Sequence, residues 1–270
     1  MSIEVLIVGL IGILAGGVSN ILADDLPHHR SVRLPHYPDG TPRPFTAWLG
    51  IGAFLFGKRV SQGGAKLSWR YPLTEMMTAV LMMLTMLTTG DIYDFAGQPA
   101  ITGLQLVFWL GYMAIFVLLA VIDLEHKLIL FVISIPTIVL VLLDAALTSF
   151  KPDLQSALIG GAVGFGTFFV LYLGGILYAH IRGISEVAFG YGDVILITIT
   201  GLILGPEALI FAMFITVFLG FVGSLAWIIG RSLSGKGHSL FTALPYGPYI
   251  IAATITMMLF SSEVRALIGY

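Results

Sequence analysis

Long apolar runs dominate this chain and limit the folds that it can adopt. A transmembrane helix needs about 20 apolar residues. Six runs of that order cover 3–23, 71–89, 103–122, 128–147, 155–179 and 207–229. A seventh run near 241–260 is interrupted by Pro245 and Pro248, and an eighth, 192–205, is short. Hydrophobic residues make up 57% of the chain and charged residues 10%, whereas a soluble domain carries roughly 25% charged residues. We therefore predict an all-α, polytopic membrane helix bundle with about eight transmembrane helices.

The basic residues predict how this bundle is oriented. Eleven of the thirteen lysines and arginines lie in loops that the predicted spans place on one side of the membrane, including seven in 24–70. Only Lys151 and Arg265 fall on the other side. Because basic loops stay in the cytoplasm, the distribution predicts the orientation of this multi-pass protein. Its loop 24–70 would be cytoplasmic and both of its termini would lie outside.

Loop 24–70 is the one substantial polar segment, and its many Pro and Gly residues disfavour regular structure. The run from Trp48 to Phe56 is apolar but too short to span. It is expected to lie on the membrane surface or to pack against the bundle, where Trp48, Phe54 and Phe56 would order the loop. The chain contains no cysteine, and the spacing of its histidines fits no zinc pattern. We therefore expect no metal site, and we expect no nucleic-acid partner.

Two aspartates carry the predicted chemistry. Asp123 ends an unbroken apolar run and Asp193 follows Gly190-Tyr191-Gly192, and the topology puts both at the cytoplasmic membrane boundary. A carboxylate at such a boundary is costly unless it has a partner or a function. Two carboxylates at one depth can share a proton and activate water. The alternatives are a helix N-cap for Asp193 and a solvated interfacial charge for Asp123.

Several sequence blocks resemble one known family, the type IV prepilin peptidases, also called leader peptidase/N-methyltransferases. The matching blocks, in chain order, are Gly16-Gly17-Val18-Ser19-Asn20 with Leu26-Pro27, Arg70-Tyr71-Pro72-Leu73-Thr74-Glu75, Ile122-Asp123-Leu124, Phe189-Gly190-Tyr191-Gly192-Asp193-Val194 and Pro245-Tyr246-Gly247-Pro248. They extend over nearly the whole chain. The departures are the absence of the cysteine pairs that many members carry in the first loop, and Asp25 where an arginine is expected.

The resemblance implies an aspartic endopeptidase of the inner (plasma) membrane that needs no cofactor, with Asp123 and Asp193 as the catalytic pair. Its substrate would be a prepilin or pseudopilin with a short basic leader. Gly190 and Gly192 would let the substrate strand approach closely, and Glu125, with Asp24 and Asp25, would attract the leader.

The resemblance also implies a methyltransferase-like segment containing Asn20, Arg70 and Glu75, with S-adenosylmethionine as the methyl donor. We accordingly expect two regions: 1–70, the first helix plus the cytoplasmic loop, and 71–270, the membrane aspartyl peptidase domain. The oligomeric state is left open.

Two alternatives compete with this interpretation. A presenilin-like intramembrane protease also carries a Gly-x-Gly-Asp motif, and Tyr93-Asp94 superficially resembles its second motif. However, the predicted topology puts Tyr93-Asp94 on the membrane side opposite Asp193. The other alternative is a non-catalytic membrane scaffold or a transporter. A transporter more often places its acids near the midplane and shows repeated halves, and neither feature is visible in the sequence.

Overall fold

The computed structural model describes residues 3–88, 103–148, 152–183, 190–233 and 245–267. Within these ranges all the regular elements are helices, apart from two isolated antiparallel bridges in the first loop, His36 with Pro42 and Val60 with Lys66. The α-helices are α1 (Ile3–Asp25), α2 (Gly50–Leu55), α3 (Arg70–Thr88), α4 (Gly103–His126), α5 (Phe131–Leu147), α6 (Leu154–Arg182), α7 (Tyr191–Leu233), α8 (Gly247–Leu259) and α9 (Ser261–Leu267). Two short 3-10 helices, η1 (Leu26–His28) and η2 (Phe45–Ala47), lie in the first loop. The predicted all-α class is confirmed.

Within the described residues every predicted span overlaps a helix, with 192–205 and 207–229 both in α7, but the count of about eight is not confirmed. Among the described residues, four helices are long and apolar enough to cross a membrane by themselves: α1, α4, α6 and α7. A fifth span results if α8 and α9, which meet at a bend of 93°, are taken together. Helix α5 is apolar but has only 17 residues.

Helix α7 joins two of the predicted runs across a kink. Gly205 has φ 74° and ψ 174°, and Pro206 follows it. A positive φ is accessible to glycine at little cost, and proline cannot donate the hydrogen bond that would continue the helix. The segments before and after the kink are therefore separate helical rods, as the runs 192–205 and 207–229 predicted.

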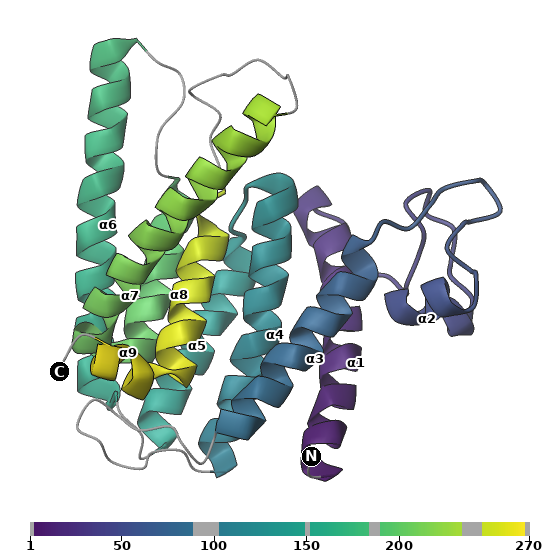
Figure 1. Cartoon of the computed structure of the whole chain (residues 1–270), viewed down its shortest axis with the longest axis horizontal. Coiled ribbons are helices and arrows are strands. Elements are labelled where there is room, and N and C mark those ends of the chain that lie inside the picture. Colours follow the sequence, from purple (N-terminus) through teal and green to yellow (C-terminus); the bar gives the residue numbers. More distant parts are fainter. Residues whose placement is uncertain (1–2, 89–102, 149–151, 184–189, 234–244, 268–270) are drawn as a thin grey trace. The chain divides into compact units, whose positions relative to one another are not determined.

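The chain divides into two compact units. The first contains Met1–Gly90 and Leu106–Leu128, and the second contains Asp91–Gln105 and Ile129–Tyr270. In the first unit α1 and α3 lie side by side (Figure 1). Glycines allow this approach, because a Cβ on Gly12 would lie 2.5 Å from Ala79 Cα and one on Gly16 the same distance from Glu75 Cα. The predicted functional regions 1–70 and 71–270 follow other boundaries and stay a prediction.

In the second unit α6 packs along α7, and α7 along α8 (Figure 1). Gly160 of α6 and Gly201 of α7 meet backbone to backbone, with no room for a Cβ on either. The hydroxyls of Thr200 and Thr254 hydrogen-bond at 2.7 Å inside the α7–α8 contact. Close packing of small residues and buried hydroxyl pairs is the usual way that helices associate in membranes.

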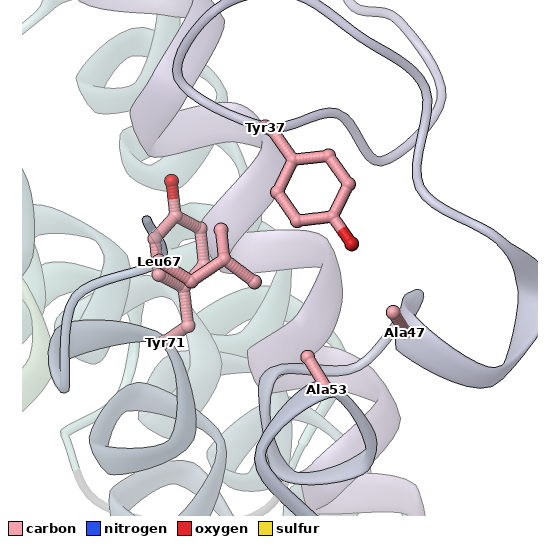
Figure 2. Close-up of a cluster of buried hydrophobic side chains, with 5 residues drawn as sticks. All are labelled: Tyr37, Ala47, Ala53, Leu67 and Tyr71. Atoms are coloured by element: carbon pink, nitrogen blue, oxygen red, sulfur yellow. The ribbon is translucent and has the colours of Figure 1, made fainter. Parts of the chain in front are cut away.

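The first loop has a small apolar core of its own. Tyr37, Ala47, Ala53, Leu67 and Tyr71 form it (Figure 2), and Phe54 packs against them. Of the three aromatic residues expected to order the loop, only Phe54 takes this part. The expectation was wrong for Phe56, which is 65% exposed, and for Trp48, which is 39% exposed. The structure instead uses small alanines on the inner side of the segment 45–56.

Candidate active site

Asp193 lies in the first turn of α7, where its carboxylate closes the turn that begins the helix. Its Oδ2 accepts a hydrogen bond from the Gly190 N–H at 3.0 Å, and its own N–H donates to the Gly190 carbonyl at 3.1 Å. This is the acidic half of a capping box, in which the third helical residue reaches back to the N-cap backbone. Asp193 is therefore not the N-cap residue itself, the alternative that the sequence left open.

The two glycines before Asp193 have different surroundings. A Cβ on Gly192 would lie 2.8 Å from Ile129 Cγ1, so Gly192 is needed for close packing against the segment before α5. Gly190 is exposed, and a Cβ there would meet nothing closer than the Asp193 carboxylate at 3.7 Å. Of the two glycines, only Gly190 leaves open space beside Asp193 for a substrate strand, and the substrate role of both stays a prediction.

Aromatic rings hold the start of α7 in place. The Tyr191 ring lies 5.8 Å from that of Tyr172 on α6 and 6.3 Å from that of Phe131 on α5. The phenol of Tyr246, at the start of α8, lies within electrostatic range of Asp193, and its ring packs on Gly220 of α7. Sequence reasoning gave Tyr246 no role. It belonged to a matching block, but no sequence pattern predicts that α8 begins beside Asp193.

Asp123 lies in the last turn of α4. Its carbonyl accepts the N–H of Lys127 at 2.8 Å, and Lys127 has φ 54°, the left-handed conformation that ends a helix. Asp123 and Asp193 are 6% and 9% exposed, respectively. Burial of this degree is unusual for carboxylates without a partner or a function. Asp123 belongs to the first unit and Asp193 to the second, so their pairing stays a prediction.

An ion-pair network joins the ends of the helices in the first unit. Arg70 at the start of α3 donates to Asp24 of α1 and, at 3.0 Å, to Glu125 of α4. Asp24 also accepts from the Tyr71 hydroxyl at 3.1 Å. The guanidinium carbons of Arg43 and Arg70 lie 4.4 and 4.2 Å from the centre of the Tyr71 ring.

Burial lowers the pKa of the Arg43 guanidinium, and the nearby Tyr71 and Asp24 partly oppose this effect.

The acids that were expected to attract a basic leader already have cationic partners within the first unit. Glu125 keeps 40% of its side chain exposed. Asp25 is fully buried and accepts from the Arg33 backbone N–H at 2.9 Å, which argues against direct contact between Asp25 and a leader.

Asn20 and Glu75 form a second buried cluster. Glu75 accepts hydrogen bonds from the backbone N–H groups of Gly50 at 2.5 Å and Ile51 at 2.8 Å, and from Asn20 Nδ2 at 3.3 Å. Asn20 Nδ2 also donates to the Tyr71 carbonyl at 3.0 Å. These contacts attach the loop to α1 and α3.

The contacts of Asn20, Arg70 and Glu75 bear on their expected place in a methyltransferase segment. Arg70 and Glu75 both have protein partners in this structure. Asn20 Oδ1 is buried and has no hydrogen-bond partner. These contacts give the three residues a local structural role, and their place in a methyltransferase-like segment stays a prediction.

The described residues contain no group of three or more His, Asp or Glu side chains positioned to hold a metal ion. The rings of His28 and His126 meet edge to face, with their centres 5.4 Å apart. His36 Nε2 lies 3.7 Å from Asp25 Oδ1. The structure thus distributes the loop histidines over separate contacts.

Comparisons with known proteins identify the family of this chain. The model of the type IV leader peptidase family matches residues 110–225, a range that contains both Asp123 and Asp193. A protein of Dichelobacter nodosus described as prepilin leader peptidase/N-methyltransferase is 30% identical over 84% of this chain and 68% of its own length. Proteins with the same description from Dickeya chrysanthemi and Bacillus subtilis (strain 168) are 30% and 25% identical, over 77% and 80% of this chain.

The chain spans about two thirds of the length of the Dichelobacter and Dickeya relatives. No solved structure matches it. The matched range, the similarity over most of the chain and the apolar helices lead to one conclusion: the chain is a multi-pass membrane protein that belongs to the type IV leader peptidase family.

Proposed function

We propose that this chain is a prepilin peptidase, which removes the short basic leader of a type IV prepilin or pseudopilin at the cytoplasmic face of the inner membrane. The family match, whose range includes a buried aspartate at the end of α4 and another at the start of α7, carries the proposal. A peptidase that works through two carboxylates needs them to hold one proton between them, so that one activates water and the other assists the scissile carbonyl.

The positions of the two aspartates at helix ends suggest which one acts as the general base and which as the general acid. A helix N-terminus favours negative charge and a C-terminus disfavours it. Asp193 lies in the first turn of α7 and accepts the Gly190 N–H, which supports the ionised form. Asp123 lies in the last turn of α4, which supports the protonated form.

In the proposed reaction, Asp193 removes a proton from water as the water oxygen attacks the scissile carbonyl, and Asp123 donates its proton to the carbonyl oxygen, which gives a gem-diol. The C–N bond then breaks as Asp193 passes its proton to the leaving amine. A hydroxyl of the gem-diol returns a proton to Asp123, so that both carboxyl groups regain their starting forms.

Two further residues, Gly190 and Glu125, are proposed to contact the substrate. Gly190 gives a peptide strand open space beside Asp193, and Glu125 offers a half-exposed carboxylate to a basic leader in competition with Arg70. A Glu125→Gln variant is expected to raise KM for prepilin while leaving kcat nearly unchanged.

The experiment that tests the proposal is cleavage of a purified prepilin by the purified chain in detergent, read as the new N-terminus by mass spectrometry. The expected product begins directly after the leader. Chelators and thiol reagents are expected to leave the rate unchanged, because a carboxylate pair needs neither metal nor thiolate. Intact prepilin after incubation with folded protein would refute the proposal.

A second activity, N-methylation of the new terminus with S-adenosylmethionine as cofactor, is proposed on the relatives' names, which include N-methyltransferase. The first unit, in which Asn20, Arg70 and Glu75 order the loop, is compatible with this activity. The mass of fully cleaved pilin after incubation with the cofactor tests it. Product without the mass of one added methyl group would show a peptidase only.

Family membership favours a prepilin peptidase over a scaffold, a transporter or a presenilin-like protease. Tyr93 and Asp94, which the presenilin-like alternative used beside the Gly-x-Gly-Asp motif, lie outside the described residues.

A further inference from the structure

The segment 45–56, which contains η2 and α2, exposes several large apolar side chains on its outer face. Phe45, Leu55 and Phe56 are 80%, 76% and 65% exposed, whereas Ala47 and Ala53 are fully buried. A cluster of large exposed apolar residues of this kind marks an interaction surface rather than an ordinary solvated one. The flanking helices indicate what covers it.

Contacts with α1 and α3 fix the level of this segment along two membrane helices. The Leu49 side chain rests on Gly17, where a Cβ would lie 2.6 Å from Leu49 Cδ2. Gly17 precedes the last residue of α1, Asp25, by eight residues, or about 12 Å at 1.5 Å per residue. The headgroup layer on each side of a bilayer is only about 5–7 Å thick. Leu49 therefore lies at the level of the membrane rather than above it.

The contact with α3 gives the same level. Glu75, five residues after the start of α3 at Arg70, binds the first two N–H groups of α2. Gly50 lies against the α3 backbone, since a Cβ there would be 2.7 Å from the Tyr71 carbonyl carbon and 2.8 Å from Pro72 N. Figure 1 shows α2 beside the first turns of α3. Pinned at its N-terminal end, α2 cannot leave the flank of the helix pair without breaking the buried Glu75 cluster.

The charge of the surrounding sequence fits a lipid surface. Between Asp39 and Glu75 the chain has no acidic residue and five basic ones, of which Lys58 and Lys66 are exposed. Trp48 and Trp69, with 39% and 62% exposure, provide amphipathic rings suited to the headgroup level. Basic groups next to an apolar face are the combination that binds anionic lipid headgroups.

We propose that the segment 45–56 is an interfacial element whose outer face, Phe45, Trp48, Leu55 and Phe56, is covered by the lipid bilayer, with Lys58 and Lys66 at anionic headgroups. This embeds the first loop in the membrane boundary instead of leaving it as a free cytoplasmic domain. The inference rests on the membrane helices and is independent of the proposed peptidase activity.

The absence of cysteine from the chain allows a direct test. Single variants Leu55→Cys and Phe56→Cys would carry a spin label in full-length protein, reconstituted in vesicles of phosphatidylcholine and phosphatidylglycerol. Leu14→Cys, on the exposed face of α1, is the bilayer reference, and Gln62→Cys, in the exposed turn of the same loop, is the aqueous reference. All four sites are on the surface, so the label does not disturb a core.

Spin labels at Leu55 and Phe56 are expected to behave like the label at Leu14. They should collide frequently with oxygen, and they should collide with a water-soluble nickel complex several-fold less often than the label at Gln62 does. Equal accessibility to the nickel complex at Phe56 and Gln62 would overturn the proposal. Protection that appears only when prepilin is added, or that rises with the protein-to-lipid ratio, would also overturn it, because a polypeptide and not lipid would then cover the surface.

Discussion

At the residue scale, Asp39 shows how the first loop is held without cysteine. Its Oδ2 accepts the Ser61 hydroxyl at 2.5 Å, and its Oδ1 accepts the N–H and hydroxyl of Thr41 at 3.0 and 2.6 Å. The carboxylate thereby connects the two tight turns that the bridges His36–Pro42 and Val60–Lys66 close. Gly40 and Gly64 supply the positive φ values, 84° and 87°, that these turns need.

This connection predicts a pH dependence of the loop. The hydrogen bonds from Ser61 and then from Thr41 lower the pKa of Asp39 below its ordinary 3.8. A carboxyl whose pKa is lower in the folded loop stabilises it above the ordinary pKa, and this contribution is lost as pH falls through the lower folded value. Hydrogen exchange at the Thr41 and Ala65 amides is therefore expected to accelerate as pH falls below about 3.8, after correction for intrinsic rates.

The control is Asp39→Asn, which has no titrating group at this position, so corrected exchange at the same amides is expected to be independent of pH in this range. An acid-dependent acceleration of equal size in wild type and in Asp39→Asn would assign the effect to some other group.

At the element scale, two glycines of α6 give a matched test of helix packing. A Cβ on Gly160 would collide with the backbone of α7, whereas a Cβ on Gly166 would meet nothing within 4 Å. Alanine gains up to about 1 kcal/mol over glycine in a helix, while overpacking costs about 1–3 kcal/mol. We expect Gly160→Ala to lower the unfolding temperature in detergent and Gly166→Ala to leave it unchanged or raise it. If the two variants had the same unfolding temperature, the α6–α7 contact would be looser than described.

The ion pairs of Arg70 differ in what they contribute to the joining of helices. The Asp24 and Arg70 side chains are 17% and 13% exposed, whereas Glu125 is 40% exposed. An exposed pair contributes roughly 0–1 kcal/mol, and breaking a buried pair costs about 3–5 kcal/mol. We therefore expect Asp24→Asn to destabilise the first unit clearly more than Glu125→Gln, as measured by denaturant unfolding. A larger loss with Glu125→Gln would contradict the ranking.

The elements show what the sequence could and could not predict. The apolar runs predicted the helices because the hydrophobicity of a segment depends only on its own residues. Gly205-Pro206 predicted the α7 kink because both residues change the conformation of their own backbone. The partners of Glu75 lie about 25 and 55 residues away, and no periodicity encodes such a distance. For the same reason the contact of Gly192 with Ile129, the position of Tyr246 and the outward orientation of Phe56 required the fold.

At the scale of the whole molecule, the basic-residue asymmetry predicts the topology, which the helices alone leave open. A reporter active only in the cytoplasm is expected to be active when fused within 30–66 and silent after Tyr270. An active fusion after Tyr270 would remove the argument that places Asp123 and Asp193 at one membrane face.

The most direct test of the central claim is the cleavage rate of prepilin by wild type, Asp123→Asn, Asp193→Asn and the double variant. Unfolding curves would confirm that all four are folded. General acid–base groups contribute about 100- to 10,000-fold, and residues that act as a unit are not additive. Each single variant is predicted to lose at least about 100-fold, with little further loss in the double variant. Full activity in either single variant, or multiplicative losses in the double variant, would contradict a shared catalytic pair.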